Sequence, residues 1–254
     1  MKIIYSRRFE ERYQTNPVEN PDRVRNPALE LMRSGYDFIE PSPAAEEDIR
    51  RVHGMEHVTN VRRRGLYETA SWAAGGAIAA AELGLAGEPA FALIRPPGHH
   101  ASASRAWGLC FFNNMAIAVR RIMQRAARVL IIDIDLHFGD GTVSIFRGDS
   151  GVRIVNPGSV DKNFDYLSMD SYGYMKQIEE ALLGFDYDVI GVSAGFDTYI
   201  EDWGGLLTTD DYEMIGRMIS EGSERCEGRR FAVLEGGYHP DLKFCISKFI
   251  KGFS

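Results

Sequence analysis

Four side chains that could hold a metal ion follow two apolar runs of the sequence. Asp133, Asp135 and His137 alternate with apolar residues after an Ile-rich run, and Asp197 follows a second run. Side chains two residues apart in an extended chain point to the same face. Because buried carboxylates are costly unless they are paired or bind a metal, the pattern favours a metal site. The alternative is that Asp133 and Asp135 cap helices while His137 packs in the core.

Two aspartates and one histidine would give three protein ligands and leave a fourth position open. That arrangement is typical of a catalytic zinc site, whereas a closed structural site would have used cysteines. Iron(II) or cobalt(II) could occupy the same ligands, because oxygen and nitrogen donors discriminate weakly among these ions. A bound ion lowers the pKa of its water from ~15.7 toward ~7. The predicted reaction is therefore hydrolysis.

Acid–base groups are expected close to the same place. His99 and His100 follow a Pro-Pro-Gly turn, and histidine can take a proton from water and return it to a leaving amine. Asp133 and Asp140 could each accept the second ring N–H of one histidine. Tyr238 follows two glycines and could polarise a carbonyl. For the histidine pair and for the Gly-Gly-Tyr turn, the alternative is simple packing at a turn.

The elements that would position these residues are strands alternating with helices. This alternation predicts a parallel sheet covered on both faces, and polar segments beyond its strand ends should meet in one crevice. We expect a single domain over residues 1–254, because no repeat or linker divides the chain. The predicted strands are Phe91–Ile94, Val129–Ile132, Val189–Val192 and Phe231–Leu234, with Lys2–Tyr5 and Val152–Val155 weaker. The predicted helices include Tyr67–Leu83, Asn114–Ala127, Tyr174–Leu183 and Thr209–Arg225, the last with a cap at Thr208 and Thr209.

Composition excludes several classes of protein. The 254 residues are 44% hydrophobic and carry a net charge of −7, which opposes broad attraction to nucleic acid or anionic lipid. No window approaches the ~20 apolar residues of a membrane span. The N-terminal residues lack a secretory signal and the three cysteines are odd in number, so we expect reduced thiols and a cytoplasmic location. Arg62–Arg64 is interpreted as a solvated helix end, with a small anion-facing patch as the alternative.

Four segments together resemble the signature segments of the histone deacetylase superfamily. They are Arg95–Ala101, Asp133–Gly141, Ser193–Asp197 and Leu234–Tyr238. That superfamily also contains acetylpolyamine amidohydrolases and acetoin-utilisation proteins, and this chain resembles a short prokaryotic-type member. The resemblance implies a three-layer α/β/α arginase-like fold with a central, mainly parallel sheet. It also implies metal-dependent removal of an acetyl or short acyl group from a small acylated amine, such as an acetylpolyamine, or from an acyl-lysine.

The resemblance also assigns roles by position. It implies Asp135, His137 and Asp197 as metal ligands, and a potassium ion held by backbone oxygens near Asp133, Asp135 and His137. The implied catalytic residues are His100 as general base and acid supported by Asp140, His99 as an electrostatic group supported by Asp133, and Tyr238 as the carbonyl-polarising group.

Two departures from the family concern the substrate. The backbone carbonyl of Gly108 is implied to accept a hydrogen bond from the substrate amide, but Leu109 stands where the family usually has Phe. One aromatic wall of the acyl-lysine tunnel is thus replaced, unless Trp107 or Phe164 supplies it. Only residues 62–66 stand where longer members carry a loop with an acidic rim residue. We therefore expect a shallower and more open tunnel.

Two other functions are weighed against this hydrolase. A binuclear manganese ureohydrolase needs an Asp-x-His-x-Asp run, whereas this chain has Asp-x-Asp-x-His. A non-catalytic acyl-ligand binding protein on the same fold should have lost a ligand, the base or the tyrosine, and all are present. The leading hypothesis is a zinc-dependent amidohydrolase.

Overall fold

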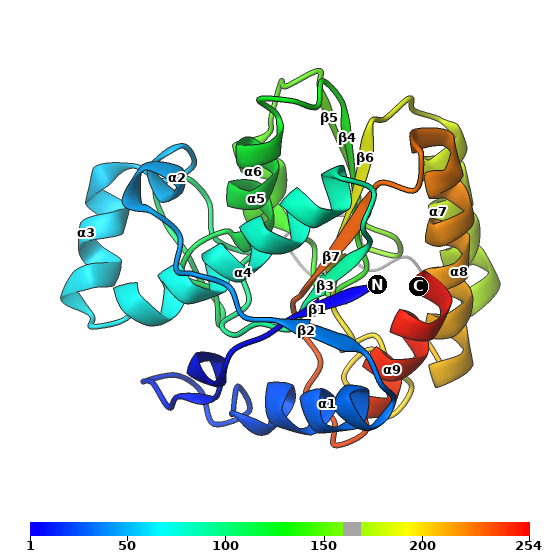
Figure 1. The fold of residues 1–254 in the computed structure, drawn as a ribbon, viewed down its shortest axis with the longest axis horizontal. Helices are drawn as coiled ribbons and strands as arrows, with labels where there is room; N and C mark the ends of the chain where they lie inside the picture. Colours follow the sequence, from blue (N-terminus) through cyan, green and yellow to red (C-terminus); the bar gives the residue numbers. More distant parts are fainter. Residues whose placement is uncertain (160–168) are drawn as a thin grey trace.

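The structure, a computed structural model, describes residues 1–159 and 169–254 (Figure 1). Its centre is a sheet of seven parallel strands in the order β2-β1-β3-β7-β6-β4-β5. The strands are β1 (Lys2–Ile4), β2 (Asp37–Ile39), β3 (Ala90–Ala92), β4 (Val129–Asp133), β5 (Val152–Val155), β6 (Val189–Ala194) and β7 (Arg230–Leu234).

The strands predicted from apolar runs are present, with small differences at their ends. β4, β6 and β7 are buried at every position, as expected for strands covered on both faces. β3 ends at Ala92 rather than Ile94, because the chain then leaves the ladder for the Pro-Pro turn. β2 was not predicted, since it is a short, partly exposed edge strand without an apolar run.

Helices cover both faces of the sheet (Figure 1). On one face α4 packs against β3 and β7 beside α5, and on the other α7 and α8 contact β4 and β6, with α9 between α8 and α1. Among the described residues, no helix combines the length and apolar character that spanning a membrane demands. The α-helices are α1 (Asp22–Arg33), α2 (Glu46–Arg50), α3 (Met55–Arg63), α4 (Tyr67–Leu85), α5 (Asn114–Ile122), α6 (Asp140–Ile145), α7 (Ser171–Leu183), α8 (Thr209–Ser223) and α9 (Leu242–Phe253), with 3₁₀ turns at Arg7–Glu10 and Glu224–Cys226.

Helix ends follow local chemistry. The predicted cap of α8 is confirmed: the Thr208 hydroxyl accepts from Asp211 N, and the Asp211 carboxylate accepts from Thr208 N in return. α5 ends at Ile122, short of the predicted Ala127. The backbone forms a tight turn there, in which Arg125 N donates to Ile122 O. The three cysteines are buried free thiols.

The sheet order explains why the polar segments meet. β3, β7, β6 and β4 are consecutive neighbours, and each is followed at its carboxyl end by one of the four segments singled out in the sequence. Parallel strands end at the same edge of a sheet, so these segments converge although 132 residues lie between the first segment and the last.

Candidate active site

A pocket of about 230 Å³ opens at the carboxyl ends of the central strands. We call it the inner pocket. Of the residues predicted from the sequence, those that line it are His99, His100, Gly108, Leu109, Asp135, His137 and Tyr238. The remaining three, Asp133, Asp140 and Asp197, contact the lining histidines from behind.

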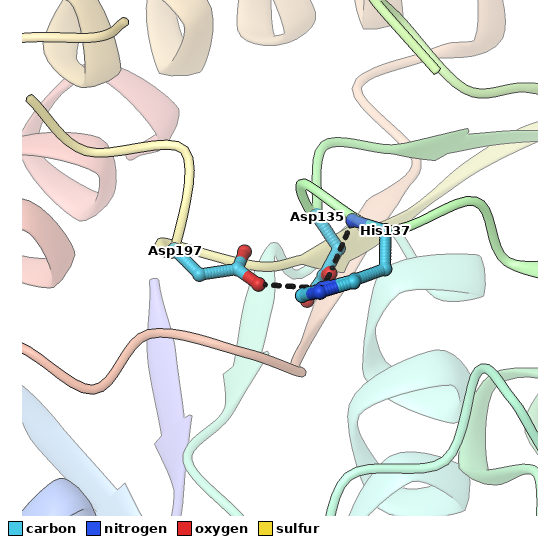
Figure 2. A group of neighbouring side chains, drawn as sticks. All are labelled: Asp135, His137 and Asp197. Atoms are coloured by element: carbon cyan, nitrogen blue, oxygen red, sulfur yellow. Dashed lines mark hydrogen bonds and ion pairs between the residues drawn. The ribbon is translucent and has the colours of Figure 1, made fainter. Parts of the chain in front are cut away.

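Asp135, His137 and Asp197 form a tight cluster at the base of the inner pocket (Figure 2). Their candidate ligand atoms all lie within 4.8 Å of one another. His137 Nδ1 is 3.2 Å from Asp135 Oδ1 and 2.9 Å from Asp197 Oδ2. One nitrogen and two carboxylate oxygens therefore converge on one point, and both aspartates are almost completely buried.

Backbone groups orient the two carboxylates of this cluster. Asp135 Oδ2 accepts from Gly236 N at 2.7 Å, and Asp197 Oδ1 accepts from Leu136 N at 2.9 Å. Each aspartate is thus held by a segment that follows a different strand. Gly236 has to be a glycine: a Cβ there would lie 2.5 Å from Asp135 Oδ2 and 2.9 Å from Asp197 Oδ2.

The donor set of this cluster fits a divalent metal ion. Burial and, next, the charge of the neighbouring Asp135 raise the pKa of Asp197 to about 6, so two adjacent carboxylates here need a compensating cation. Without an ion, His137 supplies that charge. Burial lowers its pKa, but hydrogen bonds to Asp135 and Asp197 outweigh burial and raise the pKa to about 10. Two carboxylate oxygens and one imidazole nitrogen are ligands that zinc and iron(II) accept.

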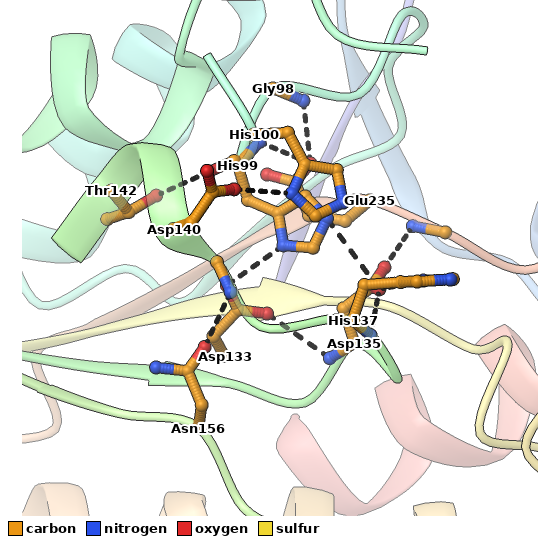
Figure 3. Close-up of polar contacts among 12 residues, drawn as sticks. Gly98, His99, His100, Asp133, Asp135, His137, Asp140, Thr142, Asn156 and Glu235 are labelled. Carbon is orange, nitrogen blue, oxygen red and sulfur yellow. Dashed lines mark hydrogen bonds and ion pairs between the residues drawn. The ribbon is translucent and has the colours of Figure 1, made fainter. Parts of the chain in front are cut away.

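The histidine pair lies beside this cluster, and each histidine has its own carboxylate (Figure 3). His99 Nδ1 is 3.1 Å from Asp133 Oδ2, and His100 Nδ1 is 2.8 Å from Asp140 Oδ1. Since a carboxylate only accepts, both contacts are ring N–H donors. Nε2 of His100 is then the ring nitrogen available to the inner pocket, whereas Nε2 of His99 lies 3.6 Å from Asp135 Oδ1.

The two histidines differ in charge state. Burial together with repulsion from His99 lowers the pKa of His100 to about 4, so His100 is neutral near pH 7. Burial also opposes protonation of His99, but the charges of Asp135 and Asp133 outweigh it and raise its pKa well above the ordinary value. The pair therefore combines a neutral ring, able to accept a proton, with a positively charged one.

Glu235 supports the histidine turn and was not assigned a role from the sequence. It is fully buried, and its Oε2 accepts from the backbone N–H of Gly98 at 2.6 Å and of His99 at 3.1 Å (Figure 3). Burial raises the pKa of this carboxyl to about 7, and the positive charge of His99 offsets only part of that effect. The sequence feature that could have pointed to Glu235 is its position directly before Gly-Gly-Tyr, within one of the four motif segments.

Tyr238 is positioned by three residues that the sequence did not single out. Asp202 accepts from the backbone N–H of Tyr238 at 2.6 Å. The buried Arg23 guanidinium lies 4.6 Å from the centre of the Tyr238 ring and donates to Gly237 O at 2.7 Å. On the pocket side the Trp203 ring stacks on Tyr238 at 4.5 Å. Arg23 lies more than 200 residues earlier in the chain, so no local pattern could reveal it.

The opposite wall of the inner pocket carries the two residues predicted to contact substrate. Gly108 has a left-handed backbone (φ 61°), and a Cβ there would lie 3.3 Å from the His100 ring. Leu109 is half-buried and lines the pocket. Trp107 stacks on His100 with ring centres 3.8 Å apart and donates to the Asp140 carboxylate. Phe164, the other aromatic residue considered for this wall, lies outside the described residues.

Comparison with known proteins gives a consistent result. The histone deacetylase domain family matches residues 17–164. A probable deacetylase from Archaeoglobus fulgidus is 35% identical over 248 residues, covering 79% of this chain and 69% of that protein. An acetylpolyamine amidohydrolase from Burkholderia pseudomallei is 33% identical over 218 residues, covering 74% and 63%. The crystal structure of an acetylpolyamine aminohydrolase from Burkholderia pseudomallei has a TM-score of 0.83 at 23% identity, covering 100% of this chain and 98% of that one.

The fold is a three-layer α/β/α domain. Its parallel strands bring an Asp–His–Asp cluster and a histidine pair to one edge of the sheet, and these features together define a class of deacetylase-like proteins. With the sequence matches, it follows that the chain belongs to the histone deacetylase family. This confirms the resemblance found in the four sequence segments and the predicted arginase-like fold.

We expect removal of one ligand to abolish metal binding. The variants Asp197→Ala and His137→Ala should retain almost no zinc after dialysis that leaves the unsubstituted protein with one ion per chain, because three protein ligands cannot spare one. Metal content measured by plasma mass spectrometry checks this. Asp210→Ala and His239→Ala, which lie outside the cluster, serve as matched controls, and near-stoichiometric zinc in either ligand variant would contradict the ligand assignment.

The buried Glu235 should make stability depend on pH. Its folded pKa of about 7 lies above the ordinary 4.5, so its stabilising contribution is complete below pH 4.5 and is lost as the pH rises through 7. Glu235→Gln keeps the acceptor oxygen but cannot ionise. Its free energy of unfolding relative to the unsubstituted protein should therefore rise by about 2–4 kcal/mol between pH 4.5 and pH 8.

Urea denaturation at both pH values, with chelator present throughout, measures this change. The exposed Glu221→Gln is the control and should show no such rise. An equal stability difference at both pH values would mean that Glu235 does not carry a buried charge at pH 8.

Proposed function

We propose that this protein is a zinc-dependent amidohydrolase that removes an acetyl or short acyl group from an amine. The observation that carries this proposal is that one pocket is lined both by the Asp135 and His137 side chains of the metal cluster and by His100, a histidine held neutral. A metal site alone fits many proteins, but a neutral base beside it is what hydrolysis requires. Membership of the histone deacetylase family supports the same reaction.

In this proposal Asp135, His137 and Asp197 hold the ion. When bound, a zinc ion supplies a Lewis acid for the substrate carbonyl and lowers the pKa of a water molecule. Iron(II) or cobalt(II) would fit the same ligands. The potassium ion that the family resemblance implies near these residues stays a prediction.

His100 serves as general base and then general acid. Its Nδ1–H is held by Asp140, so Nε2 takes the proton from the attacking water and later gives it to the nitrogen of the leaving amine. Trp107 stacks on the ring and donates to the same carboxylate, which limits rotation of His100. His99, positively charged beside Asp133, stabilises negative charge that develops on the acyl group.

Tyr238 and Gly108 orient the amide in this scheme. The Tyr238 hydroxyl donates to the substrate carbonyl oxygen, on which negative charge grows during attack. Burial raises the pKa of this phenol well above its ordinary value, so it stays protonated and able to donate. The Gly108 carbonyl accepts from the amide N–H. These contacts hold both ends of the scissile bond.

A small acylated amine is the substrate class that the pocket favours. The inner pocket of about 230 Å³ is near the lower limit for sites that hold small molecules. The short segment 62–66 provides little surface to grip a peptide backbone. A relative that acts on acetylpolyamines, as its name states, supports a small amine rather than a protein substrate.

Catalysis should separate from metal binding in one variant. We expect His100→Ala to keep its zinc but to lose about 10²–10⁴ in kcat on acetylated amines, the usual contribution of a general acid and base. Activity is measured on acetylated, propionylated and longer acyl amines, as diamines and as lysine peptides, with zinc and with iron(II). An unchanged rate would transfer the role to His99, and no hydrolysis of any substrate by the metal-loaded protein would overturn the proposed function.

Leu109 should control the choice between small amines and peptides. We expect the unsubstituted protein to hydrolyse an acetylated diamine at least as well as an acetyl-lysine peptide. Leu109→Phe should shift the ratio of kcat/KM toward the peptide by ~1–3 kcal/mol, because a flat aromatic wall clasps a linear aliphatic chain. Leu109→Met, which adds no ring, is the control. The same ratio in the unsubstituted protein and in Leu109→Phe would mean that Leu109 does not contact the substrate.

A further inference from the structure

The arginine run that follows α3 does not act as one unit. Arg62 lies over the Tyr67 ring and makes an ion pair with Glu46 at 2.6 Å, so its charge is compensated. Arg64, the residue at which α3 is capped, lies over Phe111, with its guanidinium carbon 5.2 Å from the ring centre. Within residues 1–159 and 169–254, no acidic side chain makes an ion pair with Arg64.

Arg64 faces a second cavity that adjoins the inner pocket. This outer pocket has a volume of about 580 Å³ and is lined by Gln14, Thr15, Asn16, Arg64, Leu109 and Phe111, with Gly108. Asn16, Gly108 and Leu109 also line the inner pocket, so the two cavities meet along these residues. A substrate whose amide reaches the metal cluster would extend past Leu109 into the outer pocket.

The outer pocket is polar and carries a single formal charge. Two amides and a hydroxyl come from residues 14–16, and Arg64 is the charged residue among those that line it. A cation at this position would repel the free ammonium of an acetylated diamine.

We propose that the outer pocket binds a carboxylate, so that the preferred substrate is an N-acylated amino acid whose carboxylate is contacted by Arg64. Guanidinium groups bind carboxylates through charge-assisted hydrogen bonds, and the amides of Gln14 and Asn16 can donate to the same group. This inference rests on the proposed function, since it concerns the distal end of the substrate of that same site. It makes Arg64 a specificity-determining residue.

The test uses substrates that differ only in the distal group. N-acetylated straight-chain amines of three to six methylenes, ending in carboxylate, carboxamide or ammonium, are compared with the zinc-loaded enzyme. We expect kcat/KM to fall from carboxylate to carboxamide to ammonium at the best chain length, by about tenfold between the first two. The preference should reside in KM. It should weaken as salt is raised from 0.05 to 0.5 M, because this change shortens the electrostatic screening length roughly threefold.

Arg64→Gln should remove this preference by lowering kcat/KM for the carboxylate substrate to about the value for the carboxamide substrate. Arg63→Gln is the matched control: it has the same substitution one residue earlier on an exposed helix end, and Arg63 lines neither pocket. Binding of the non-acetylated amino acid products, followed by the fluorescence of Trp107 and Trp203, gives a second readout that needs no turnover.

Two failures can be told apart. If the enzyme hydrolyses the carboxamide substrate but shows no preference for carboxylate, or if the preference persists in Arg64→Gln, the carboxylate site is wrong and the proposed function stands. If no acylated amine is hydrolysed and yet carboxylate products still bind in an Arg64-dependent way, the proposed function is wrong while the anion site remains.

Discussion

Burial of several carboxylates at one sheet edge is the constraint on which the site depends. Asp133, Asp135, Asp197 and Glu235 are each at most 2% exposed, and all lie at or just beyond the carboxyl ends of neighbouring strands. Without compensation they would repel one another and lose their hydration. The fold supplies the compensation from many directions: two histidines, several backbone N–H groups, and glycines that allow carboxylates and backbone to approach. A site with this requirement can form only where strand ends converge.

The same constraint explains why two adjacent histidines differ. His99 faces two buried carboxylates, Asp133 and Asp135, and is held protonated. His100 faces Asp140, which is less deeply buried, and it is further discouraged from protonation by the charge of His99. His99 is thus charged because of its two carboxylates, whereas burial and the charge of His99 outweigh Asp140 and keep His100 neutral. Proton transfer and charge stabilisation can then be divided between neighbours in the sequence.

The residues that lie within a recognisable local sequence pattern could be predicted. The Asp-x-Asp-x-His run follows an apolar strand with a two-residue period, and the Pro-Pro-Gly turn marks the histidine pair, so the strands and these side chains could be named from the sequence. Edge strand β2 could not be predicted, because one exposed and two half-buried residues show no alternating pattern. Arg23 and Asp202 could not be predicted, because they contact Tyr238 only in the folded chain and no local sequence pattern marks them.

Under the proposed function, reaction chemistry and substrate choice would be encoded differently in this chain. The candidate reacting groups lie at strand ends, where burial and sheet order leave little freedom, and the family match over residues 17–164 includes those that follow β3 and β4. The outer pocket is built from residues 14–16, from the end of α3 and from the loop carrying Leu109, three segments remote in sequence. Loops of this kind can change charge without disturbing the carboxylate cluster. If the proposed function and the carboxylate site hold, this chain keeps a hydrolytic site at its strand ends while Arg64 at the rim selects the charge of the substrate.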